Sequence, residues 1–289
     1  MVEIAICLAI IGIALVSIIG VLPIGMNTQR DNREETIINQ DATIFMEAIR
    51  SGAHGLDDLT NYVYAISNYW TFYDNTGASN SGGVDGFSTS PPSFLTNGMN
   101  IVGVLSRPEF IDGSGDPIPN VSMGGFSNHV VAYVRSISGP AIEKPLQDND
   151  IVRQDSFGYR LLCVNAPVAN YTPPFWVAQT YNAGDNVSRL LGGQYSYWQA
   201  IFAGQPSLPP QSVDVPGNSV RWMRVFYPEE LAANLHELRL TFLWPQQPNG
   251  SVGPGHQTFR TLVAGQLTRD SYLTNLYFYA SQSFLNVTN

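Results

Sequence analysis

The longest uncharged stretch of the chain lies at its amino end, and it limits what the chain can fold into. No residue from Ile4 to Met26 carries a charge. A helix of roughly 20 apolar residues is long enough to cross a hydrocarbon core about 30 Å thick. One acid, Glu3, precedes the run, and the next charges are Arg30 and Asp31. The remainder of the chain must therefore be a domain attached to an apolar rod.

Three interpretations of this rod compete. A cleaved signal peptide has a basic start, a shorter apolar core and a small-residue cleavage site, whereas this chain has no Lys or Arg before Arg30. A single-span membrane anchor fits the length, but it leaves Glu3 as a costly acid at the edge of the apolar run. A helix that passes from the membrane into a protein assembly would provide that acid with a partner.

Three short features of the rod carry a family resemblance: Val2-Glu3-Ile4, Ile10-Ile11-Gly12-Ile13 and Pro23. Together they resemble the amino end of type IV pilins and type II secretion pseudopilins, over about 30 residues. In that family the mature chain has an acid at its fifth position and a glycine nine positions later, and Gly12 stands nine positions after Glu3. Because the acid is third here, we expect either that an aromatic residue and a threonine precede Met1 in the mature protein, or that this chain is processed differently.

The resemblance implies a structural subunit of an extracellular, type IV pilus-like helical filament. Its partners would be copies of itself, the inner membrane before assembly, and the pilus or secretion assembly machinery. Glu3 would pair with the terminal amine of a neighbouring copy and set the axial register. The other expected assembly residues are Gly12, Gly20 and Pro23, and the resemblance implies that helical structure near Pro23 is lost locally on assembly.

Two alternative functions remain open. The chain can be a minor pilin or a type II secretion pseudopilin, or it can be a monomeric, membrane-anchored β-rich binding domain. The task of a filament (adhesion, motility, DNA uptake or secretion) is open as well.

Composition agrees with a packed head that associates with copies of itself. The chain has 289 residues, of which 44% are hydrophobic and only 13% are charged. A net charge of −9 argues against a general nucleic-acid-binding surface, although Arg221 and Arg224 are close in sequence. The chain has two cysteines, Cys7 in the apolar rod and Cys163 in the head. Because they lie in different parts of the molecule, we expect no disulfide between them within one chain. The head must therefore be stable without a disulfide.

The hydrophobic pattern predicts an α+β fold, in which a long amino-terminal helix packs on a β-rich head with large loop insertions. The helix would cover residues 1–50 and should kink or melt locally near Gly20–Gly25, because Pro23 cannot donate a hydrogen bond and clashes with the preceding turn. We expect the helix to end at Ser51-Gly52, so that residues 1–52 form the helix (1–27 in the membrane or filament core) and residues 53–289 form the head. Charged residues, Asp41 among them, should lie away from an apolar stripe with a period near 3.6, formed by Ile37, Ile38, Ile44, Phe45, Ala48 and Ile49.

The head should contain a short second helix at Leu56–Asn68, followed by a loop over residues 75–99. Residues 166–218 are irregular and predict a large insertion packed on the sheet. The clearest hairpin joins Glu237–Trp244 to Gln257–Val263, because apolar and polar residues alternate along its first strand. Further strands are expected at Asn100–Leu105, His129–Ser136, Tyr159–Val164 and Ser219–Phe226, with a strand or helix at Tyr272–Tyr279.

No motif for catalysis or for a cofactor is present in the sequence, so we expect neither an enzyme nor a cofactor. The four histidines (His54, His129, His236 and His256) lack the spacing of a metal-binding motif. Carboxylates in turn-forming loops are weak candidates for Ca²⁺, but their spacing does not match an EF-hand, and solvated turns explain them better. These candidates are Asp112, Asp116, Asp148 and Asp150.

Overall fold

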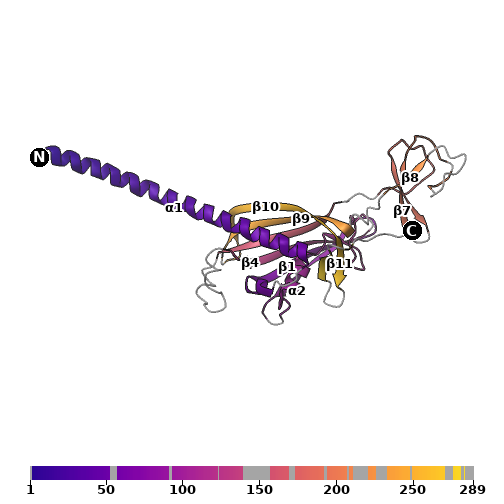
Figure 1. Cartoon of the computed structure of the whole chain (residues 1–289), viewed down its shortest axis with the longest axis horizontal. Coiled ribbons are helices and arrows are strands. Elements are labelled where there is room, and N and C mark those ends of the chain that lie inside the picture. Colours follow the sequence, from indigo (N-terminus) through magenta and orange to yellow (C-terminus); the bar gives the residue numbers. More distant parts are fainter. Residues whose placement is uncertain are drawn as a thin grey trace.

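The chain consists of one long helix followed by a head built mainly of antiparallel strands (Figure 1). The computed structural model describes residues 2–52, 57–90, 93–122, 124–138, 157–168, 173–191, 194–206, 208–210, 221–225, 233–247, 249–270, 276–280 and 283. The α+β class predicted from the sequence pattern is confirmed.

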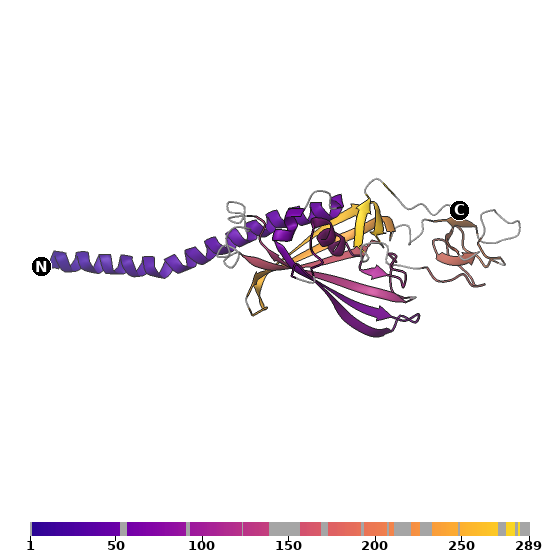
Figure 2. The same ribbon diagram turned by 90° about the horizontal axis from the view of Figure 1, so that it is seen from below.

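Helix α1 runs without interruption from Val2 to Ser51. At 1.5 Å per residue its 50 residues span about 75 Å. Of the two outcomes predicted near Gly20–Gly25, a kink or a local loss of helix, this single chain shows no loss of helix. A proline removes one backbone hydrogen bond and strains the preceding turn, which bends a helix without having to end it. Figure 2 shows such a bend in the part of α1 that projects from the head.

The end of α1 agrees with the prediction. Gly52 has a φ of 74°, and its N–H bonds to the carbonyl of Ile49 at 3.4 Å, as in a left-handed helix cap. A Cβ atom at this position would lie 2.9 Å from the carbonyl oxygen of Tyr279. Glycine is therefore required both by the backbone angle and by the close approach of the carboxyl-terminal strand.

The main sheet has seven strands and is covered on one face by α1 and α2. Its order is β10-β9-β5-β4-β1-β2, and β3 also pairs with β4. Every pairing is antiparallel. The strands are β1 (Val63–Tyr73), β2 (Ser79–Ser88), β3 (Phe110–Ile111), β4 (Gly125–Arg135), β5 (Gly158–Pro167), β9 (Leu235–Gln246) and β10 (Val252–Ala264).

The core lies between this sheet and the helical layer. Helix α2 (Gly98–Leu105) packs beside the carboxyl-terminal half of α1, and a two-stranded sheet of β11 (Gln266–Asp270) and β12 (Leu276–Ala280) closes the layer. The apolar stripe predicted on α1 is buried there except for Ile44, which is half-buried, and Ile38, Phe45 and Ile49 are fully inaccessible.

Three predictions for the first part of the head are wrong. Leu56–Asn68 is not a helix, because a short 3₁₀ turn at Asp57–Asn61 leads directly into β1. The expected loop at 75–99 contains β2, whose glycine-rich sequence hides its pairing with β1. The expected strand Asn100–Leu105 is part of α2, which begins where Oδ1 of Asn97 accepts a hydrogen bond from the N–H of Asn100 at 2.8 Å.

The strands predicted later in the chain agree with the structure. His129–Ser136 and Tyr159–Val164 fall largely within β4 and β5, and the predicted hairpin is β9 and β10. Ser219–Phe226 includes the short strand β8 (Trp222–Arg224), and β12 confirms the strand alternative for Tyr272–Tyr279.

The prediction that region 166–218 packs on the main sheet is wrong for its described strands, although Ala166 and Pro167 still belong to β5. Together with β8, its strands β6 (Asn186–Leu191) and β7 (Gln194–Ala200) form a separate three-stranded sheet. This small sheet has its own apolar cluster, which consists of Tyr181, Val187, Trp198, Ala200 and Trp222. Figures 1 and 2 place it beyond the main sheet, at the opposite end of the molecule from the start of α1.

Candidate functional site

The part of α1 that projects from the head is exposed, and it is apolar from Ile4 to Met26. Every residue whose exposure is described between Val2 and Arg33 is exposed, and the apolar side chains point in all directions around the helix axis. A helix that is apolar all round belongs in a membrane or inside a protein assembly. Among the described residues of this segment the large exposed ones are Val2, Ile4, Ile6, Leu8, Ile10, Ile11, Ile13, Leu15, Val16, Ile18, Ile19, Val21, Leu22 and Met26.

Removal of this apolar surface from water would release a large free energy. Burying one such side chain is worth about 1.5–3 kcal/mol, so the set corresponds to roughly 20 kcal/mol or more. A whole domain is typically stable by only about 5–15 kcal/mol. The projecting segment therefore needs an apolar environment that the head of its own chain does not provide.

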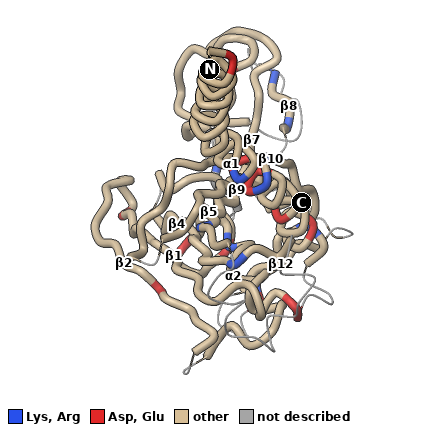
Figure 3. Tube along the Cα trace, turned by 90° about the vertical axis from the view of Figure 1, so that its left-hand side faces the viewer, with Lys and Arg blue, Asp and Glu red and all other residues tan. Residues whose placement is uncertain are grey.

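By length and composition α1 is able to cross a membrane, and it is the one such helix in the described part of the chain. The charged residues agree with this placement. Figure 3, which looks along α1 from its amino end, shows charge at that end and again where the helix meets the head.

The four residues predicted to act in assembly all lie on the projecting segment. Glu3 is exposed and has no hydrogen bond or ion pair with any residue that the structure describes. A Cβ atom added to Gly12 or Gly20 would meet nothing within 4 Å, so packing within this chain does not require glycine at either position. Pro23 lies inside the helix. The structure does not bring these residues into contact with the head.

The junction between helix and head depends on a residue that the sequence pattern placed wrongly. Asp41 was expected on a solvent-facing side of α1, but it is completely buried. Its carboxylate accepts hydrogen bonds from the backbone N–H groups of Ile137 (2.9 Å) and Ser138 (2.8 Å) and from the hydroxyl of Tyr159 (2.8 Å). Its position four residues from both Ile37 and Phe45 was the signal for burial.

The environment of Asp41 favours its neutral form. Burial raises the pKa of the carboxyl group, and the hydrogen bonds from Ser138, Ile137 and Tyr159 lower that pKa without cancelling the effect. The three donors come from β5 and from the segment after β4, so this one side chain fixes the rotation of α1 against the sheet.

A groove of about 430 Å³ lies where α1 leaves the head. The helix contributes Arg30, Asp31, Glu34 and Glu35, and the β9–β10 hairpin contributes Trp244, Pro245, Pro254 and Gly255. Arg30 is paired with Glu34 at 2.8 Å between Nε and Oε1. The groove is therefore polar and mainly acidic on its helical side.

The Ca²⁺ candidates fall into two groups. Asp112 closes its own turn, because its Oδ1 accepts the N–H groups of Ser114 and Asp116, each at 2.8 Å. Asp148 and Asp150 lie outside the described residues. Within the described part of the chain no group of three His, Cys, Asp or Glu side chains is arranged to hold a metal ion.

The remaining titratable groups are scattered. His236 is fully buried beside Tyr279, and burial lowers its pKa to about 4. The buried thiol of Cys163 donates to the carbonyl of Leu105 at 3.0 Å, and burial raises its pKa to about 12, which makes it a poor nucleophile. Cys7 and Cys163 are both unpaired, as expected.

Comparison of the chain with known protein families, with curated protein sequences and with solved structures finds no match.

Proposed function

We propose that this protein is a structural subunit of a helical, type IV pilus-like filament on the cell surface, held in the inner membrane before assembly. The observation that carries the proposal is the division of α1 into two halves. The carboxyl-terminal half is locked to the head through Asp41 and an apolar stripe, whereas the segment from Val2 to Met26 is apolar all round and is not buried by any part of the head that the structure describes.

Transfer of the projecting segment from lipid into a bundle of identical segments releases little hydrophobic free energy, because both environments are apolar. Close packing and polar pairing then decide how copies align. An unpaired carboxylate inside such a bundle would be strongly unfavourable. Glu3, paired with the terminal amine of a neighbouring copy, would set one axial offset between copies.

The glycines of the rod support close packing between copies. A glycine in a helix interior costs about 1 kcal/mol relative to alanine. Among the described residues, Gly12 and Gly20 have no neighbour whose close packing would offset this cost. Small residues let the backbones of neighbouring helices approach closely inside a membrane or an apolar bundle.

The proposed contact is head-to-tail and does not close on itself, so repeated copies give an open helical filament. The heads would coat a core of rods. Pilus or secretion machinery would supply the work of extraction from the membrane, and no cofactor or Ca²⁺ is needed for this role.

The test is the variant Glu3→Leu in cells that make the protein. We expect the variant to remain in the membrane fraction and to give no filaments in electron micrographs of sheared surface material. The matched control is Asp31→Ala, which removes an acid from the same helix outside the apolar run and should leave filaments intact.

Normal filaments from Glu3→Leu would overturn the register mechanism. Wild-type protein found only as a membrane monomer would favour an anchored binding domain instead. Short or scarce assemblies that still depend on Glu3 would identify a minor pilin or a pseudopilin rather than a main shaft subunit.

A further inference from the structure

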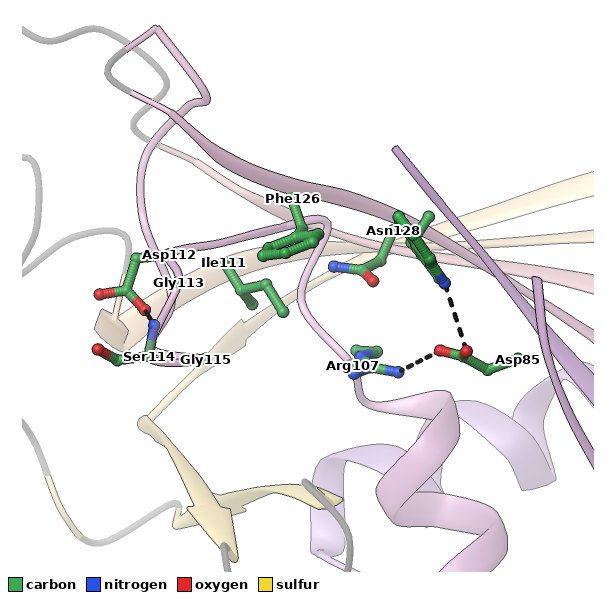
Figure 4. Close-up of a pocket in the computed structure, with 10 residues that line it drawn as sticks. Asp85, Arg107, Ile111, Asp112, Gly113, Ser114, Gly115, Phe126 and Asn128 are labelled. Carbon is green, nitrogen blue, oxygen red and sulfur yellow. Dashed lines mark hydrogen bonds and ion pairs between the residues drawn. The ribbon is translucent and has the colours of Figure 1, made fainter. Parts of the chain in front are cut away.

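A pocket opens on the inner face of the main sheet, where the helical layer stops short. Helix α2 ends at Leu105, but β1 and β4 continue beyond it. Their inward-facing side chains help to line a space of about 370 Å³, and no described helix contributes a lining residue to it. Figure 4 shows this pocket between the sheet, Arg107 just after α2, and the turn after β3. Its size lies at the lower end of the range of small-molecule sites, which is about 300–1,000 Å³.

One wall of the pocket is aromatic. The rings of Trp70 and Phe126 lie 5.9 Å apart in an edge-to-face arrangement. The indole lies against Gly83 of the neighbouring strand, where a Cβ atom would come within 2.6 Å of the ring. Glycine at this position lets the indole lie close to β2. The indole N–H also donates to Oδ1 of Asp85 at 3.3 Å, which holds the ring in place.

The opposite wall carries polar groups that can still form hydrogen bonds with a ligand. Arg107 is 3.8 Å from Asp85 between a terminal nitrogen and Oδ2, and its buried Nε has no acceptor among the described residues. The side chain of Asp85 is about half exposed (48%), so its carboxylate can accept further bonds. Ser114 is exposed and lies on the turn that Asp112 closes. The pocket thus presents donors and acceptors side by side.

The charged side chains that line the pocket limit the kinds of ligand that it can bind. A phosphate or carboxylate would bind Arg107 but would face the carboxylate of Asp85, 3.8 Å away. A cation would face the guanidinium group. A neutral ligand rich in hydroxyl groups avoids both penalties, because each hydroxyl donates and accepts. The aliphatic face of a sugar ring can also pack against an aromatic wall.

We propose that this pocket binds a neutral saccharide, with Trp70 and Phe126 against the ring and with Asp85 and Arg107 bonded to hydroxyl groups. This binding does not depend on assembly through α1, since the pocket lies entirely within the head.

The test uses the full chain in a zwitterionic detergent, so that no sugar-based detergent competes for the site. The probes are the methyl glycosides of glucose, galactose, mannose and N-acetylglucosamine, observed by saturation-transfer NMR and then titrated. We expect saturable binding of at least one probe, and a loss of affinity of tenfold or more in Trp70→Ala. The matched control is Tyr69→Ala, an exposed aromatic residue on the opposite face of the same strand, which should bind as the wild type does.

Asp85→Asn provides a second variant that keeps the shape of the side chain, and it should weaken binding while the thermal unfolding temperature stays within a few degrees of the wild type. The proposal is overturned if no probe binds saturably, or if Trp70→Ala and Asp85→Asn, both folded, bind as the wild type does. Binding of inorganic phosphate that depends on Arg107, without saccharide binding, would also overturn it.

Discussion

At the scale of single residues, Asp41 connects the helix to the head. It is a carboxylate without access to solvent, and it satisfies two backbone N–H groups and one tyrosine hydroxyl. Burial of a carboxylate is costly, and the three hydrogen bonds offset part of that cost. The arrangement allows one rotation of α1 about its axis, which a purely apolar stripe would specify less sharply.

Replacement of Asp41 by alanine should lower the free energy of unfolding of the head by about 2–4 kcal/mol, because three buried donors lose their acceptor. The measurement is urea unfolding of the full chain in detergent at pH 7. Glu47→Ala, on an exposed position of the same helix (65% exposed), should change the free energy by less than about 0.5 kcal/mol. A loss from Asp41→Ala no larger than that of the control would contradict this role.

The pH dependence of stability reports the ionisation of the same group. Because the pKa of Asp41 is raised in the folded state, the folded protein binds a proton more readily than the unfolded chain, whose aspartate pKa is about 3.9. The part of the stability that comes from this raised pKa is therefore fully present below that value and is lost as pH rises through the folded pKa, whereas the hydrogen bonds that Asp41 accepts are a separate contribution. Asp41→Ala should lack this decline. An identical decline in both proteins would assign it to another group.

At the scale of elements, α1 combines two helices of different physical character in one continuous rod. The segment from Val2 to Met26 has no buried residue among those described, whereas the segment after Glu34 contributes Ile38, Phe45 and Ile49 to the core. The stability of the head should therefore depend only on the second segment.

A chain of residues 29–289 should stay in solution without detergent, and its unfolding temperature should lie within about 3 °C of the full chain's. The reason is that the removed residues make no buried contact with the head. A chain of residues 40–289 is the matched control. It also loses Ile37 and Ile38, and it should unfold at least about 5 °C lower. Circular dichroism on heating measures both values, and equal losses in the two chains would contradict the division of α1.

At the scale of the whole molecule, the head contains two separate apolar cores. The main core lies between the large sheet and the helical layer, and the small sheet buries Trp198 and Trp222 in a cluster of its own. Figures 1 and 2 show the two parts as distinct bodies along the length of the molecule. Changes in one core should therefore have little effect on the other.

Trp198→Ala should destabilise the small sheet by about 3–5 kcal/mol and leave the main sheet unaffected. Hydrogen exchange followed by mass spectrometry should show faster exchange in β6 and β7, with β4 and β9 unchanged. Phe242→Ala in β9 is the reciprocal variant and should speed exchange across the main sheet. Faster exchange in both sheets from Trp198→Ala would show that the two cores unfold together.

Local patterns predicted much of this molecule. The 3.6-residue period identified the packed half of α1, and strict alternation identified the hairpin of β9 and β10. The hydrophobic pattern gave the wrong secondary structure where pairing between distant segments determined it. Val63–Tyr73 is a strand because β4 lies beside it over nearly its whole length, and glycine-rich β2 is a strand because it pairs with β1. Asn100–Leu105 has a strand-like composition, but its capped start and its packing beside α1 and β12 make it helical.

The apolar run from Ile4 to Met26 was decided by the sequence alone, because its length and lack of charge require an apolar environment whatever the rest of the chain does. The tertiary structure alone decided that Asp41 is buried, that residues 166–218 contribute strands to a second sheet, and that Trp70, Asp85 and Arg107 meet in one pocket. Composition and period are local properties, so a sequence displays them directly. Contacts between residues far apart in the chain depend on which strands pair and where a covering helix ends, and no local pattern records either.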